Sequence, residues 1–142
     1  MTRFVLDPSV ALAWFLDQPV PAYATQVRHA LVVGARAVVP SLWHLEVANT
    51  LVVAERRRIL SSAEVIDSLA DIEEIIVQAT QTSGDLVPVR QALTTARTFQ
   101  LTAYDAVYLD TARREGLPLA TLDRSPRAAA ARASVEIFRR VS

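Results

Sequence analysis

Residues 4–16 read FVLDPSVALAWFL and hold a short strand, an acid and the start of a helix in direct succession. The apolar run at residues 4–6 is typical of a buried strand. Asp7-Pro8-Ser9 predicts a helix start, with Pro8 at the first helical position, and an apolar helix follows. This stretch decides the fold class, because a strand that passes directly into a helix is typical of a parallel sheet covered by helices.

The same alternation continues along the chain. We expect further strands at residues 37–39, 86–89, 119–122 and 135–138, and helices at 22–33, 42–57, 63–80, 90–99, 102–115 and 125–133. Ser41 and Ser62 are expected to cap two of these helices. The order predicts an α/β fold with a central, mainly parallel sheet of about four or five strands flanked by helices.

Length and composition are those of one globular domain. The chain has 142 residues, 51% of them hydrophobic and 21% charged, so we expect a single domain over residues 1–142. The N-terminal apolar run is too short for a signal peptide or a membrane span. We therefore expect a soluble, cytoplasmic protein without membrane contact.

The residue types that the chain lacks exclude several kinds of site. There is no cysteine, which excludes disulfides, cysteine-based zinc sites, iron–sulfur clusters and thiol nucleophiles. His29 and His44 are the only histidines, and their spacing does not suit a histidine-rich metal site. The 15 basic residues, all arginine, balance 15 acidic ones, so any contact with nucleic acid must be local.

Four acids are expected at one edge of the sheet. Asp7 and Asp123 directly follow expected strands, and Glu46 and Asp105 lie in the first turns of helices that begin on the same rim. Crowded carboxylates repel one another unless a divalent cation offsets the repulsion. Oxygen ligands without cysteine or paired histidine favour a hard ion, Mg²⁺ or Mn²⁺. The pattern therefore predicts a metal site suited to phosphoryl chemistry.

Each acid also has a purely structural alternative. Asp7 could only cap a helix, and Asp105, three residues after Thr102, could complete a capping box. Asp123 could be an ordinary turn residue. Glu46 differs, because it lies on a partly buried helix stripe where an unpaired carboxylate is costly. We expect a cation as its partner.

Four segments resemble those of PIN-domain ribonucleases, and more narrowly those of VapC toxins of type II toxin–antitoxin pairs. Residues 4–9 (FVLDPS) resemble the family's opening strand with its first acid, and residues 40–49 (PSLWHLEVAN) resemble the segment with the second. Residues 101–109 (LTAYDAVYL) and 119–123 (LATLD) resemble the segments with the third and fourth. The resemblance runs nearly end to end and implies a PIN-like three-layer α/β/α fold.

The resemblance also implies roles for individual residues. It assigns catalysis and the binding of Mg²⁺ or Mn²⁺ to the four acids, Asp7, Glu46, Asp105 and Asp123. It assigns supporting polar roles to three further residues, Ser9, Asn49 and Thr121. Two arginines expected near the rim, Arg97 and Arg124, are candidates for holding RNA phosphates. Tyr104 and Trp14 could stack on bases, but core packing is the expected role of both.

The function implied by the resemblance is that of a metal-dependent endoribonuclease, acting as a toxin that a cognate VapB-like antitoxin neutralises. Family members are commonly homodimers, so we expect a homodimer and a toxin–antitoxin hetero-oligomer. Residues 42–80 carry more apolar side chains than one sheet face requires, among them Val52, Ile59 and Ile66. This excess indicates either a partner surface or ordinary core burial.

Two other classes of function remain as alternatives. A receiver domain or an aspartyl-phosphate phosphatase also places acids and Mg²⁺ at the edge of a parallel sheet. The receiver requires a lysine that is absent, and the phosphatase requires a second Asp where Ser9 stands. The non-enzymatic alternative is a catalytically silent PIN-like module that binds protein or RNA.

Overall fold

Two buried strands form the centre of the sheet in this computed structural model, which describes residues 2–84 and 86–139. They are β1 (Arg3–Leu6) and β2 (Arg36–Pro40), which pair in parallel with Phe4 opposite Ala37 and Val5 opposite Val38. Their apolar side chains are buried on both faces. This explains why both strands are continuous apolar runs, since a strand covered by helices on two faces has no solvent-facing side.

The sheet has four strands in the order β3-β2-β1-β4, and all of its pairings are parallel. β3 (Thr80–Ser83) and β4 (Leu119–Ala120) form the two edges. The predicted α/β fold with a mainly parallel sheet is therefore confirmed. Because every strand runs in the same direction, all of their carboxyl ends meet at one edge of the sheet.

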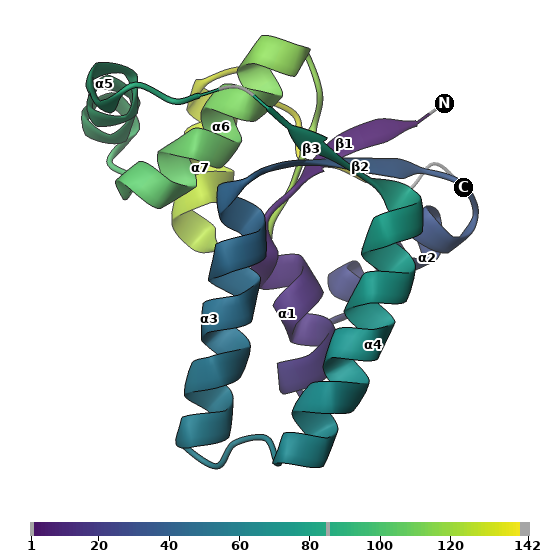
Figure 1. Cartoon of the computed structure of the whole chain (residues 1–142). Coiled ribbons are helices and arrows are strands. Elements are labelled where there is room, and N and C mark those ends of the chain that lie inside the picture. Colours follow the sequence, from purple (N-terminus) through teal and green to yellow (C-terminus); the bar gives the residue numbers. More distant parts are fainter. Residues whose placement is uncertain (1, 85, 140–142) are drawn as a thin grey trace.

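Seven helices in the described residues flank this sheet. They are α1 (Pro8–Leu16), α2 (Ala22–Val32), α3 (Leu42–Arg56), α4 (Ser62–Ala79), α5 (Val89–Phe99), α6 (Ala103–Glu115) and α7 (Arg124–Arg132). In Figure 1, α3 and α4 form a long antiparallel pair that extends below the strands, with α1 beside it. None of the helices in the described ranges is long and apolar enough to cross a membrane.

One apolar core joins the sheet to the helices. Val10 and Trp14 of α1 and Trp43 of α3 are buried in it with the side chains of β1 and β2. Leu109 of α6 belongs to the same cluster. α6 ends at Glu115 and is capped by Gly116. The φ of Gly116 is +66°, a left-handed conformation that glycine adopts without steric cost. The chain can therefore turn back at once into β4.

The strand expected at residues 86–89 is wrong. The third strand is β3 at residues 80–83, and residue 89 already begins α5. β3 reads TQTS, and it pairs with β2 through its backbone at the exposed edge, where apolar side chains are not required. The expected strand at 135–138 is reduced to a single bridge between Leu119 and Ile137.

Ser41 stands at the expected N-cap position of α3 but makes no capping bond, and the cap expected at Ser62 is wrong. The backbone of Ser41 is itself helical (φ −58°, ψ −30°). α4 begins at Ser62, and the cap is Ser61. The Ser61 hydroxyl accepts from the Glu64 N–H at 3.1 Å, and the Glu64 carboxylate accepts from the Ser61 N–H at 2.9 Å. These two bonds form a complete capping box one residue earlier than expected.

Candidate metal centre

Asp7 lies where β1 passes into α1 and is only 3% exposed. Its Oδ2 accepts a hydrogen bond from the backbone N–H of Ser9 at 3.1 Å, so it caps α1. The same oxygen accepts a bond from the hydroxyl of Thr121 at 3.3 Å. Because both bonds use Oδ2, the capping role of Asp7 leaves Oδ1 free of them and does not compete with a role in a metal site.

Asp105 and Asp123 reach the same place from the other half of the chain. Asp105 is half-buried in the first turn of α6, where its backbone N–H donates to the hydroxyl of Thr102 at 3.0 Å. Asp123 is exposed at the start of α7 and makes no capping bond with its side chain. Carboxylate oxygens of Asp7, Asp105 and Asp123 all lie within 4.8 Å of one another. Three oxygen ligands at this spacing fit Mg²⁺ or Mn²⁺.

Glu46, the fourth predicted acid, lies beside this group of three and is not part of it. It is half-buried in α3, and its Oε1 accepts a 2.6 Å hydrogen bond from the hydroxyl of Tyr108. The partner found for Glu46 among the described residues is this hydroxyl group, and the expected cation stays a prediction. Glu46 remains close enough to Asp105 and Asp123 for their charges to affect its pKa.

Burial and mutual repulsion raise the pKa values of Asp7, Asp105 and Glu46. Burial raises the pKa of Asp7 to about 7, with smaller contributions from the charges of Asp123 and Asp105, against hydrogen bonds from Ser9 that lower it. Burial also raises the pKa of Asp105, followed by repulsion from Asp123. The pKa of Glu46 rises for the same reasons, although the Tyr108 bond lowers it. A cation bound here would favour the charged forms and release protons.

Thr121 and Ser9 hold the acids in place. Thr121 is fully buried after β4, and its hydroxyl accepts from the backbone N–H of Asp123 at 3.1 Å while it contacts Asp7. The Ser9 hydroxyl lies 3.3 Å from that of Thr121 and accepts from the backbone N–H of Leu122 at 3.0 Å. This network joins the segment after β4 to the start of α1.

The other three predicted residues lie outside this network. Asn49 is exposed on α3 and lines a pocket with Glu46, without a hydrogen bond to the acids among the described contacts. Arg124 is exposed and directly follows Asp123. Arg97 is exposed in the last turn of α5. Within the described residues, neither arginine bonds to the acids, so a role in phosphate binding stays a prediction for both.

Sequence reasoning missed Tyr108 and misjudged Tyr104. Tyr108 lies three residues after Asp105 on α6, so it shares a helix face with a predicted acid, and this spacing could have identified it. Tyr104 was expected to pack in the core, but it is 61% exposed. Trp14 does pack in the core, where its indole N–H donates to the carbonyl of Ala24 at 2.8 Å. His29 and His44 are both exposed.

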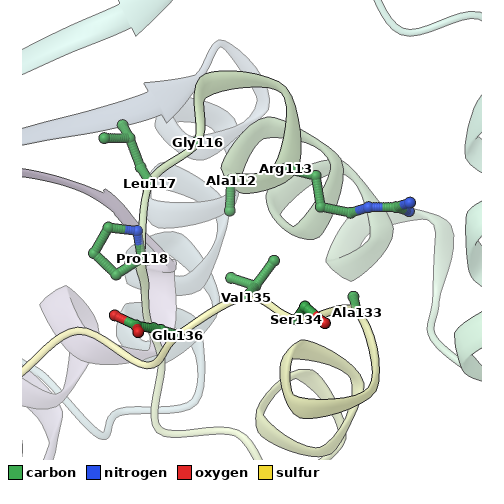
Figure 2. Close-up of a pocket in the computed structure, with 9 residues that line it drawn as sticks. All are labelled: Ala112, Arg113, Gly116, Leu117, Pro118, Ala133, Ser134, Val135 and Glu136. Atoms are coloured by element: carbon green, nitrogen blue, oxygen red, sulfur yellow. The ribbon is translucent and has the colours of Figure 1, made fainter.

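A cavity elsewhere in the fold lacks the features of a catalytic or ligand-binding site. It has a volume of about 440 Å³ and lies where α6 turns into β4, at the opposite end of that strand from Thr121. Figure 2 shows that the guanidinium of Arg113 points away from the other lining residues, and that Glu136 lies on the far side from it. Polar groups therefore do not converge here as the three acids do at the carboxyl edge.

Comparison with known proteins agrees with this geometry. The fold is similar to the crystal structure of PAE2754 from Pyrobaculum aerophilum, with a TM-score of 0.67 over 90% of this chain and 84% of that one. The two sequences are 22% identical, so this likeness concerns the fold alone. None of the curated proteins matches the sequence.

The family follows from the sequence as well as from the fold. Residues 4–132 match the PIN domain family, and this range contains all four predicted acids. PIN domains are generally metal-dependent nucleases, in agreement with a cluster of carboxylates at the carboxyl edge of a parallel sheet. The chain belongs to the PIN domain family.

Proposed function

We propose that this protein is a Mg²⁺- or Mn²⁺-dependent endoribonuclease that hydrolyses phosphodiester bonds of RNA. The observation that carries the proposal is the convergence of Asp7, Asp105 and Asp123, from three separate elements, to within 4.8 Å of one another in a PIN domain. Acids so far apart in the sequence have no need of one another for folding, since each helix start already has its own cap or turn. Their shared position supports a common ligand.

The residues of the site have different roles in the proposed hydrolysis. The bound ion would make water a nucleophile at neutral pH and offset charge on the phosphate. Asp7, held by Ser9 and Thr121, would be one of the ligands of the ion. Tyr108 fixes Oε1 of Glu46, and we assign to Oε2 the acceptance of a proton from the attacking water. Water adds to phosphorus, and the bond from phosphorus to the leaving oxygen breaks.

We propose further that the nuclease is a VapC-like toxin of the cytoplasm, neutralised by a VapB-like antitoxin, and that it forms homodimers and toxin–antitoxin hetero-oligomers. The apolar side chains of α3, α4 and the turn between them support a partner surface, since Val52, Ile59 and Ile66 are exposed although Leu51 and Leu60 are buried. An apolar groove of about 220 Å³ lies between the two helices, lined by residues that include Val47 and Leu69. Exposed apolar area of this kind is typical of interaction surfaces.

The test is cleavage of total cellular RNA by the purified protein freed of any partner, with Mg²⁺, with Mn²⁺ and with chelator. We expect discrete fragments that require the metal and that vanish in Asp7→Asn and Asp105→Asn. Asp67→Asn is the matched control, because it removes an exposed carboxylate of α4 that is not part of the group of three. This variant should cleave as the wild type does.

A second measurement separates the nuclease from the silent binding module. Mn²⁺ titration by calorimetry should show binding to the wild type that Asp105→Asn weakens by at least about tenfold. A folded protein that binds Mn²⁺ through these acids but cleaves no RNA would contradict the proposed activity. Absence of carboxylate-dependent Mn²⁺ binding would contradict the metal centre itself and would favour the module that only binds a partner.

A further inference from the structure

Tyr104 presents its ring to solvent directly beside the metal centre. It occupies the first turn of α6, immediately before Asp105, and 61% of its surface is exposed. Ala106, two residues further along the helix, is fully buried, whereas Thr102 and Ala103 are exposed like the tyrosine, so the start of α6 faces solvent on this side. An exposed aromatic ring next to a candidate metal ligand has no structural role in the core and is available to a ligand.

The ring forms one wall of a pocket whose other walls come from α3. The pocket has a volume of about 340 Å³ and is lined by Leu45, Glu46, Asn49, Thr50 and Tyr104. Glu46 belongs both to this pocket and to the surroundings of the three acids, so the two sites share a wall. A ligand group seated here would be adjacent to a phosphate held at the acids.

The chemistry of the lining residues suits a nucleobase. Tyr104 offers a ring face for stacking, and Leu45, which is 71% exposed, offers an apolar edge. The hydroxyl of Thr50 already donates to the backbone carbonyl of Glu46 at 2.9 Å. Asn49 makes no hydrogen bond among the described residues, so its amide keeps a donor and an acceptor for the edge of a base.

We propose that this pocket is a base-binding subsite for the nucleotide next to the cleaved bond, with Tyr104 stacking on the base and Asn49 bonding to its edge. The inference rests on the proposed ribonuclease function. A protein partner is less well suited to this pocket than to the groove between α3 and α4, since one of its walls is a carboxylate of the candidate active site. In RNA, a single sugar joins base and phosphate, so the two sites must be adjacent, as they are here.

The experiment measures binding of a fluorescent single-stranded oligoribonucleotide and of the same backbone without its central bases. It uses the full chain in an Asp7→Asn background, in which cleavage is not expected. Tyr104→Ala should lose about 5- to 150-fold in affinity for the complete oligonucleotide, as is typical when one stacked base is lost. It should bind the abasic backbone as its parent does, and Tyr104→Phe should retain the preference for bases.

Val32→Ala is the matched control, because Val32 is also exposed but lines a different pocket at the end of α2. It should leave both affinities unchanged. Asn49→Ala should reduce discrimination among the bases more than it reduces overall affinity. Cleavage of the same oligonucleotides is then measured with proteins that retain Asp7. Tyr104→Ala should lower kcat/KM for the complete oligonucleotide and leave it unchanged for the abasic one.

Each outcome decides the subsite separately from the nuclease. If Tyr104→Ala keeps the full preference for bases, the subsite is wrong, whether or not the protein cleaves RNA. If the preference depends on Tyr104 but no variant cleaves, the subsite stands and the nuclease does not. A protein that neither binds nor cleaves RNA overturns both. Tyr104→Ala could also bind RNA normally but no longer retain a protein that co-purifies with the wild type. This result would overturn the subsite and would assign Tyr104 to the contact with that partner.

Discussion

The hydroxyl of Tyr108 donates a 2.6 Å hydrogen bond to Oε1 of Glu46, across 62 positions of sequence. Tyr108 is 1% exposed, so its ring is fixed by the core and its hydroxyl has a fixed position. Burial raises the pKa of Tyr108, and the bond to Glu46 raises it further, so the hydroxyl stays protonated and remains a donor. The core of the protein thereby determines where the carboxylate of Glu46 stands beside the candidate metal centre.

Removal of this bond should impair the site more than the fold. Tyr108→Phe keeps the buried ring, and we expect Mn²⁺ affinity or the cleavage rate to fall by about 10- to 100-fold, as is typical when a group that orients a metal-site residue is lost. Thr111→Val is the matched control, because it also removes one hydroxyl bond of a buried α6 residue, from Thr111 to the carbonyl of Val107. Calorimetric titration and RNA cleavage measure both variants. Equal effects of the two substitutions would contradict the positioning role.

Thr121 should be required for the rigidity of the acids. Thr121→Val preserves shape but removes the hydroxyl that donates to Asp7 and accepts from the N–H of Asp123. We expect a loss of about 1–3 kcal/mol in the free energy of unfolding, measured in urea, because buried polar groups lose their partner. Metal affinity should fall as well. Thr121→Ser, which keeps the hydroxyl and lacks the methyl group, should retain both properties, and a Ser variant as weak as Val would contradict the assignment of the effect to the hydroxyl.

The metal-free protein should lose stability as the pH rises from about 4 to about 7. The folded pKa of Asp7 is about 7, above its usual value of 3.8, so the folded state holds a proton in this window that the unfolded state has released. The stabilisation from this proton is fully present below the pKa that Asp7 has in the unfolded state. It is lost as the pH rises through the pKa that Asp7 has in the folded state. It amounts to a few kcal/mol at most. Thermal unfolding with chelator should show the loss, and Asp7→Asn should reduce it.

Metal binding should have the opposite dependence on pH. Below a pH of about 7 the ion must displace the proton of Asp7, so Mn²⁺ affinity should rise with pH by up to about tenfold per unit and then level off. Calorimetry in buffers of different ionisation enthalpy should detect the released proton. An affinity that does not change between about pH 5 and 8 would show that Asp7 is not a ligand.

A buried pair away from the site should matter for stability alone. The hydroxyl of Thr95 lies 2.9 and 3.0 Å from the two carboxylate oxygens of Asp110, and both residues are buried where α5 packs on α6. Thr95→Val should cost about 1–3 kcal/mol, since the Asp110 carboxylate is left without this donor. Thr98→Val, whose exposed hydroxyl bonds only to a backbone carbonyl of its own helix, should cost far less. The double variant Thr95→Val with Asp110→Leu should regain part of the loss.

The parts of the site that sequence predicted are those with a local signal. Asp7 directly follows an apolar strand and precedes a proline, and Asp105 stands three residues after a capping threonine. Such patterns depend on neighbours within one turn, so they can be recognised without knowledge of the fold. The parallel topology then brings these acids together at one edge.

The parts that sequence did not predict depend on distant contacts. The bond between Tyr108 and Glu46 requires α3 and α6 to meet, and the exposure of Tyr104 depends on how far α3 covers the start of α6. β3 was misplaced for a related reason. Its polar sequence TQTS pairs with β2 through backbone groups, whereas the apolar run at 86–89 forms no strand. A hydrophobic pattern identifies segments whose side chains are buried. An exposed edge strand has few buried side chains, so the pattern does not reveal it.

The edges of the sheet constrain how copies of this chain can associate. β3 is four residues long, and its side chains are engaged by other elements, as when Thr82 bonds to His44 and Ser83 to Arg114. At the other edge, the backbone of Leu119 is bonded to Glu136 and Phe138, so β4 is already covered. Short and covered edges do not favour the addition of a foreign strand. Growth of the sheet into fibrils or strand-swapped oligomers is therefore disfavoured, and self-association of this chain is left to its helices.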